Sequence, residues 1–242
     1  SQDNILAENT TQSPSFDITR LSDIPDSQNL FADYNPSKQS DSANLVDQSG
    51  NGRDLTSFGD PTLLSEFFGT NDAIDLDGSG DYYVGSEKEF GTLDQPFTIY
   101  IVFENDAGTD TAEKVLLNTP TSTSGAEIRW DGRSGKNNWK FRAPTQSRFG
   151  KNTPFYRDIV SVWDGSNSLL LADGNEVVSG FDIGTDSLEG LTIGQRDKIG
   201  APEFDNTRRW NGKIGRILIY DGAHSSQQRT AVRTYLSDEG WI

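Results

Sequence analysis

The sequence contains no cysteine and only one histidine, His224. The absence of cysteine excludes disulfides, zinc–thiolate centres and a thiol nucleophile. No apolar run approaches the roughly 20 residues that a membrane-spanning helix needs. The first residues, SQDNILAENTTQS, lack the basic start and apolar stretch of a signal peptide, so either a signal was removed or the protein leaves its cell by another route.

Basic residues are scarce as well: 21 Lys and Arg residues stand against 37 Asp and Glu residues, a formal net charge of −16 at pH 7. Such an acidic surface repels phosphate backbones and anionic lipid headgroups, so we expect no nucleic acid and no membrane as partner. Two interpretations of the charge stay open. One is adaptation to high salt, where ions screen the self-repulsion, and the other is an ordinary acidic extracellular protein.

Hydrophobic residues make up only 33% of the chain, whereas 24 glycines and 10% aromatic residues suit short strands joined by tight turns. From Leu30 onward, apolar runs alternate with turn signals roughly every ten residues. The run FTIYIVF at 97–103 predicts a strand covered on both faces. The pattern as a whole predicts an all-β fold, a two-sheet antiparallel β-sandwich (jelly roll).

The two ends of the chain depart from this pattern. Ser225 to Gln228 form a capping box, after which Ala231, Val232, Tyr235 and Leu236 fall on one helical face. We therefore expect one short C-terminal helix, anchored by Trp241 and Ile242. Residues 1–28 are rich in Ser, Asp, Asn, Gln and Thr, which indicates an arm or linker before a single domain at 29–242.

Four segments in order resemble the concanavalin A-like lectin/glucanase superfamily, in its laminin-G-like branch. They are DQSGNGRDLTS at 47–57, AIDLDGSGDYYVG at 73–85, QPFTIYIVF at 95–103, and the stretch at 208–242 that contains GKIGRILIYD. The resemblance implies a jelly roll of two antiparallel sheets. Such domains are frequent in secreted glycan-binding proteins and in tail, fibre or capsid-surface proteins of viruses of bacteria and archaea.

Catalytic signatures are weak. Hydrolases of this superfamily place paired carboxylates on one strand, as E-x-D-x-x-E or E-x-D-x-E, so that alternate side chains share a cleft. The nearest fragment, Glu203-Phe204-Asp205, has no third acid after it. Lyases on the fold resemble one another in a Tyr, His, Gln and Arg set, but His224 stands in a turn and no nucleophile elbow is present. We therefore expect no enzymatic activity.

A structural calcium ion is a possible cofactor, since domains of this kind often hold one through about six to eight oxygen ligands. The candidate ligands are Asp47, Asn51, Asp54 and Asp221. The turn from Asp77 to Asp81 offers a further cluster of acids and carbonyls, without the distant Glu of a full calcium loop. The alternative is that these Asp and Asn side chains only cap turns.

Glycan recognition needs aromatic faces that stack on sugar rings, with amides and charged groups for the hydroxyls. The stretch RWDGRSGKNNWKFRAP at 129–144 predicts such a site. Its candidate carbohydrate-binding residues are Trp130, Arg133, Lys136, Asn138 and Trp139, with Tyr156 as a further one. Core packing is the alternative for the tryptophans. A basic loop on an acidic protein would also suit an anionic glycan.

These observations favour a non-catalytic surface module, extracellular or on a virion surface, that binds carbohydrate or a host-surface glycan. One alternative is a purely structural decoration protein that forms homo-oligomers or joins a virion through its N-terminal arm. A second is a glycan-degrading hydrolase or lyase on the same fold.

Overall fold

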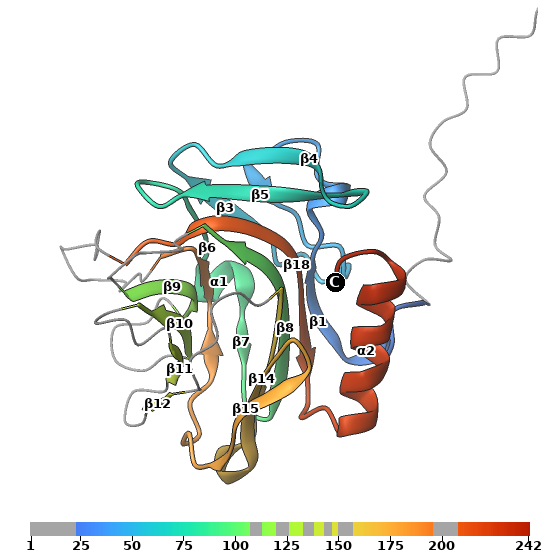
Figure 1. Cartoon of the computed structure of the whole chain (residues 1–242), viewed down its shortest axis with the longest axis vertical. Helices are drawn as coiled ribbons and strands as arrows, with labels where there is room; N and C mark the ends of the chain where they lie inside the picture. The colour runs from blue at the N-terminus through green and yellow to red at the C-terminus, as the bar shows by residue number, and fades with distance from the viewer. Residues whose placement is uncertain are drawn as a thin grey trace, which may run out of the picture.

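A computed structural model describes residues 23–106, 113–119, 126–132, 138–142, 157–195 and 208–242, and the backbone of 147–149. Within these residues the protein is an all-β sandwich of two large antiparallel sheets, with one three-turn helix outside the first sheet (Figure 1). The predicted fold class, including the short C-terminal helix, is confirmed.

The first sheet runs through the middle of the molecule. Its strands, in spatial order, are β15 (Asn175–Phe181), β14 (Ser168–Ala172), β13 (Asp158–Trp163), β8 (Phe97–Asn105), β18 (Asn211–Asp221), β5 (Asn71–Asp77) and β4 (Thr62–Phe68). The long β18 pairs with β8 along one side, and on its other side with β5 and then with β1 (Leu30–Tyr34). β18 therefore joins β8 on one side to β5 and β1 on the other.

The second sheet contains shorter strands. In order they are β12 (Ser147–Phe149), β11 (Asn138–Arg142), β10 (Glu127–Asp131), β9 (Glu113–Asn118), β17 (Leu191–Ile193), β6 (Tyr82–Gly85), β3 (Leu55–Phe58) and β2 (Asn44–Leu45). A small pair, β7 (Thr92–Leu93) with β16 (Leu188–Glu189), and the one-turn helix α1 (Glu87–Phe90) complete the described body together with short 3₁₀ turns.

The main core lies between the two sheets, because strand side chains alternate and each sheet turns one face inward. In β8, Ile99, Ile101 and Phe103 join this core, while Tyr100 and Val102 belong to a second buried cluster on the opposite face. Every residue of 97–103 is buried. The prediction that this strand is covered on both faces is confirmed.

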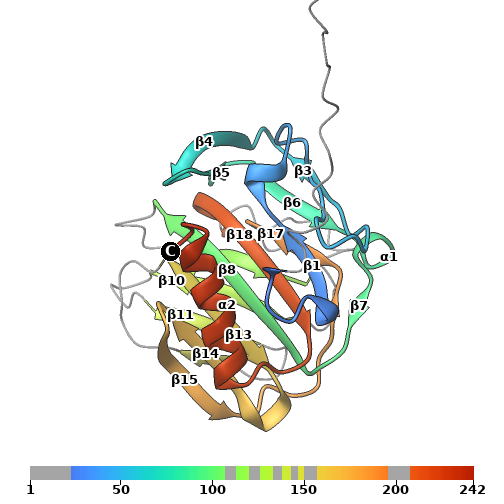
Figure 2. The same cartoon turned by 90° about the vertical axis from the view of Figure 1, so that its right-hand side faces the viewer.

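The second cluster forms where helix α2 (Ser226–Asp238) crosses the outer face of the first sheet (Figure 2). The capping box of Ser225 and Gln228 starts the helix, as the sequence predicts. Val232 and Leu236 are buried against the sheet, and Trp241 is 1% exposed. The side of the helix with Val232 and Leu236 faces the sheet, and polar residues occupy the other side, so the helix is amphipathic.

The N-terminal boundary predicted at residue 28 falls too late. Ile24 is 4% exposed and belongs to the cluster under α2, while Asp26 accepts a hydrogen bond from Gln228. Residues 23–28 are thus part of the folded body, because the apolar Ile24 side chain packs in the cluster beneath α2. Residues 1–22 of the predicted arm lie outside the described residues.

Candidate functional site

The second sheet has one side turned away from the main core, and we refer to this side as the outward face. Strand register places one row of mostly polar side chains across it: Asn44, Thr56, Val84, Thr192, Asn118, Glu127 and Arg142. Side chains two residues along each strand project on the same side, so this row identifies the whole face.

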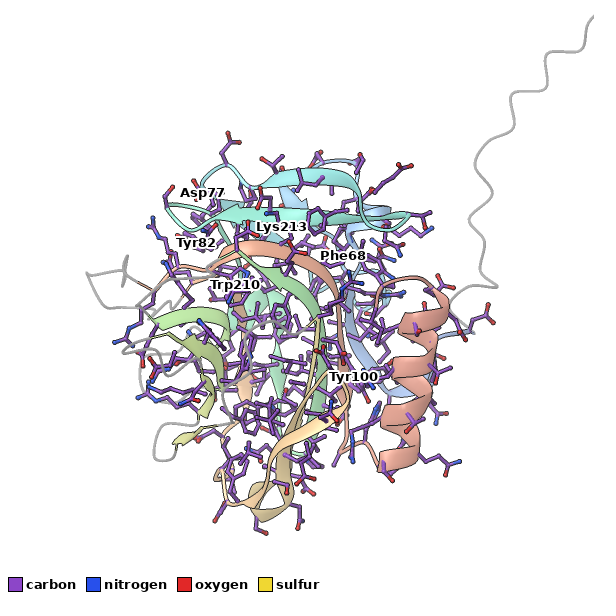
Figure 3. All side chains as sticks on the ribbon, viewed as in Figure 1. Phe68, Asp77, Tyr82, Tyr100, Trp210 and Lys213 are labelled. Atoms are coloured by element: carbon purple, nitrogen blue, oxygen red, sulfur yellow. The ribbon has the colours of Figure 1, made fainter. Side chains whose placement is uncertain are left out.

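An aromatic pair stands at one end of this face. Phe58 of β3 lies directly across from Tyr82 of β6, and their rings stack with centroids 4.8 Å apart and planes 4° from parallel. Phe58 is 47% exposed, whereas Tyr82 is 7% exposed beneath it. Figure 3 shows Tyr82 near Asp77, at an end of the molecule away from α2. An exposed ring held flat by a second ring can stack on a sugar.

A network of ion pairs occupies the other end of the face. Arg129 Nη1 lies 2.9 Å from Glu127 and 3.2 Å from Glu113. Lys140 donates to Glu113 and lies 2.8 Å from Asp131. These five side chains come from β9, β10 and β11, and each is 7% exposed or less. Alternation explains the arrangement, because Ile128 and Phe141 take the intervening inward positions.

The network keeps its central carboxylate ionised. Burial acts to raise the pKa of Glu113, but the hydrogen bond from Lys140 and the charges of Arg129, Lys140 and Arg208 outweigh burial and hold it below its ordinary value. Arg208 and Arg142 complete the set, at 3.3 Å from Glu113 and 3.7 Å from Glu127. Their side chains are 26% and 29% exposed, so cationic groups are accessible on this face.

The structure corrects the prediction for Trp130 and Trp139. The two residues are paired across β10 and β11, but their rings pack edge to face within the main core at 4% and 1% exposure. Neither indole has a free face for a sugar, because both share the inward side of their strands with Ile128 and Phe141. Asn138 is half-buried, at the outward position next to Trp139. Arg133, Lys136 and Tyr156 lie outside the described residues.

Three of the predicted calcium ligands, Asp47, Asn51 and Asp54, form hydrogen bonds that stabilise the loop at 47–54. The Asp47 carboxylate accepts backbone hydrogen bonds from Asp33, Ser49 and Arg53. Asn51 donates to Leu30 and Phe31, and Asp54 accepts from the Asp47 amide. Asp221 is exposed at the end of β18.

Among the described residues no group of three or more His, Asp or Glu side chains is placed to hold a metal ion. Calcium therefore stays a prediction, which a melting curve with and without a chelator would test.

Of the residues weighed as catalytic candidates, the structure describes His224. Glu203, Phe204 and Asp205 lie outside the described residues. His224 is 3% exposed, and its Nδ1 lies 2.7 Å from the Tyr100 hydroxyl beneath α2. It is therefore placed on the opposite side of the first sheet from the outward face. No described helix is long and apolar enough to span a membrane.

The signal for Phe58 and Tyr82 was present in the sequence as strand alternation. Leu55 is fully buried in the core, so Phe58, three positions on, points to the opposite side. Tyr82 is likewise opposite to the buried Tyr83. Sequence reasoning favoured tryptophans beside a Gly- and Asn-rich loop and so missed a phenylalanine in a regular strand.

No protein-family model matches the chain, and no curated protein matches it. Solved structures do share the fold. Domain 4 of AbnA, an extracellular GH43 arabinanase from Geobacillus stearothermophilus solved with arabinotriose, is similar over 84% of this chain and 97% of its own, with TM-score 0.54 and 14% identity. The binding domain of botulinum neurotoxin serotype D/C is similar over 87% of this chain, with TM-score 0.63 and 11% identity.

A third similar structure is Trypanosoma rangeli sialidase in complex with sialic acid, with TM-score 0.62 and 14% identity over 88% of this chain. The match spans 33% of the sialidase and 52% of the neurotoxin domain, so the chain corresponds to a part of each. At these identities the likeness concerns the fold alone. It agrees with a lectin-like jelly roll and assigns no site.

Proposed function

We propose that the protein is a carbohydrate-binding module and that its glycan binds on the outward face, with a sugar ring stacked on Phe58. The observation that carries this proposal is the stacked, 47% exposed phenylalanine on the same side of the sheet as a row of polar side chains. The similar arabinanase domain solved with arabinotriose and the toxin binding domains support this class of function for the fold.

We further propose that the module has no catalytic activity. Glycoside hydrolysis needs one carboxylic acid that stays protonated near neutral pH, which requires a raised pKa. The described carboxylates at the ionic end of the face instead lie against arginine and lysine, and the pKa of Glu113 is lowered. Glu113 is therefore a poor proton donor, although such groups can orient hydroxyls.

The setting that we propose is outside the cell, on a secreted assembly or a virion. The similar arabinanase is extracellular, and the neurotoxin matches are binding domains. In such a setting a module with net charge −16 would remain soluble while it is held to a surface through its glycan.

Replacement of the exposed ring tests the proposal. Phe58→Ala is expected to weaken glycan binding about tenfold or more, because it removes an apolar surface that the ligand would cover. Glycan-array screening of the wild-type chain followed by titration of the best ligand gives the measurement. The fold should survive, since half of the Phe58 side chain already meets solvent.

Val46→Ala is the matched control, because Val46 is the other exposed large apolar residue of the described chain, at 42%, and follows the edge strand β2. Equal affinity of wild type and Phe58→Ala would contradict the proposed site. An array without any ligand, together with a stable oligomer in sedimentation, would favour the structural decoration role. Release of reducing or unsaturated sugars would favour an enzyme.

A further inference from the structure

The described side chains at the ionic end of the outward face carry more positive than negative charge. Five cationic side chains reach its ionic end, Arg129, Lys140, Arg142, Arg208 and Arg209, against three carboxylates, Glu113, Glu127 and Asp131. Counted over the described residues, this end thus has a positive balance on a chain whose formal charge is −16. Over the Debye length of about 10 Å, local charges dominate the field that a bound ligand experiences.

Hydrogen-bond donors without acceptors lie at the same place. Gln195 Nε2, Thr192 Oγ1 and Arg129 Nε are buried and have no hydrogen-bond partner among the described residues. Gln195 uses its carbonyl oxygen for Arg209 Nε at 3.1 Å, so its amide nitrogen remains available. Thr192 and Arg129 project outward by strand register. Buried donors without partners are costly, and acceptor oxygens would satisfy them.

The two ends of the face therefore present different chemistry. Asp60, Asp77 and Asp81 lie near the end of β3 at Phe58 and the start of β6 at Tyr82. The Asp81 carboxylate accepts the backbone N–H groups of Asp60 and Asp77. An anionic group would be repelled there, while a neutral ring could stack. The arginine side chains at the other end suit carboxylate or sulfate oxygens, which guanidinium groups bind through paired hydrogen bonds.

We infer that the outward face selects acidic glycans, whose carboxylate or sulfate ester meets Arg142, Arg208 and Arg209 while a neutral ring stacks on Phe58. This inference rests on the proposed function, since it names the class of glycan for the same face. Glycans without an acidic group are therefore not the preferred ligands. The bound glycan has one orientation across the sheet, with its acidic group at the arginines and a neutral sugar on Phe58.

The test is a glycan array in which each acidic glycan is paired with its carboxyl-reduced or desulfated counterpart, probed with the whole chain. Acidic members are expected to bind about tenfold or more tightly than their neutral counterparts. Carboxylated and sulfated members, compared with each other, identify the acid group. Arg142→Gln should remove most of the difference, and Arg142→Lys should restore part of it.

Arg157→Gln is the matched control, because Arg157 is exposed at the start of β13 in the first sheet, and its loss changes the net charge equally. Equal binding of acidic and neutral partners, abolished by Phe58→Ala, would overturn this inference and leave the proposed function intact. Equal loss of affinity for acidic glycans in Arg142→Gln and Arg157→Gln would likewise overturn this inference and leave the proposed function intact. Absence of all glycan binding would overturn both. Matching melting curves of the variants would show that each is folded.

Discussion

His224 is a buried titratable side chain with contacts from four directions. Its Nδ1 lies 2.7 Å from the Tyr100 hydroxyl, its Nε2 lies 3.3 Å from Asp26, and the Tyr220 ring lies 4.4 Å away. Arg229 donates to its backbone carbonyl. Burial lowers the pKa of His224 below its ordinary value, and the neighbouring Asp26 carboxylate only partly opposes this effect. The neutral imidazole is therefore the form that the folded protein favours.

A pH dependence of stability follows from this residue. Because the folded pKa lies below the unfolded value, the unfolded chain binds a proton first as the pH falls below about 6.5. The free energy of unfolding should therefore decrease from pH 7 toward the lower folded pKa. His224→Gln removes this titration, so its stability should depend less steeply on pH over the same window, as urea unfolding at each pH would measure. Parallel pH profiles of the two proteins would contradict the assignment.

At the scale of elements, helix α2 is held by side-chain contacts to the first sheet. Arg216 of β18 forms two hydrogen bonds with Asp33 of β1, at 3.0 and 2.8 Å, and donates to the Tyr235 hydroxyl on α2 at 2.6 Å. Val232 and Leu236 fill the space beside this polar link. The apolar contacts provide most of the stabilisation, because forming a buried ion pair costs desolvation that offsets much of its attraction.

Leu236→Ala tests this account of the helix. The substitution should lower the free energy of unfolding by about 2–5 kcal/mol, since it leaves a cavity under α2. Gln227→Ala serves as the control, because Gln227 is exposed on the same helix and its loss should cost less than about 0.5 kcal/mol. Equal losses in chemical denaturation would mean that α2 gains its stability from helix formation and not from docking.

For the whole molecule, the net charge of −16 makes self-repulsion a general cost of the compact state. Sodium chloride from about 0.01 M to about 1 M shortens the screening length from roughly 30 Å to roughly 3 Å. We therefore expect the melting temperature to rise with chloride concentration. Chloride is preferred to sulfate, which strengthens apolar burial by a separate mechanism. A melting temperature independent of chloride would reject both this argument and adaptation to high salt.

Much of the fold could be predicted because it depends on local pattern. The run at 97–103 could only be a strand covered on both sides, and Ser225 to Gln228 could start a helix without help from distant residues. Ile24 was assigned to the arm because one apolar residue among polar neighbours has no periodicity to reveal its partner. Its position under α2 depends on residues near the other end of the chain.

The candidate site shows where local pattern stops being sufficient. Alternation places Trp130 with Ile128, and Phe58 opposite to Leu55, but it does not say which side of a strand faces the core. The sequence by itself determined the strands, the helix and the acidic character of the surface. Only the tertiary structure decided that the tryptophans fill the core, while Phe58 and the arginines lie on the outward face. The reason is physical: a strand has two equivalent sides until another layer packs against one of them.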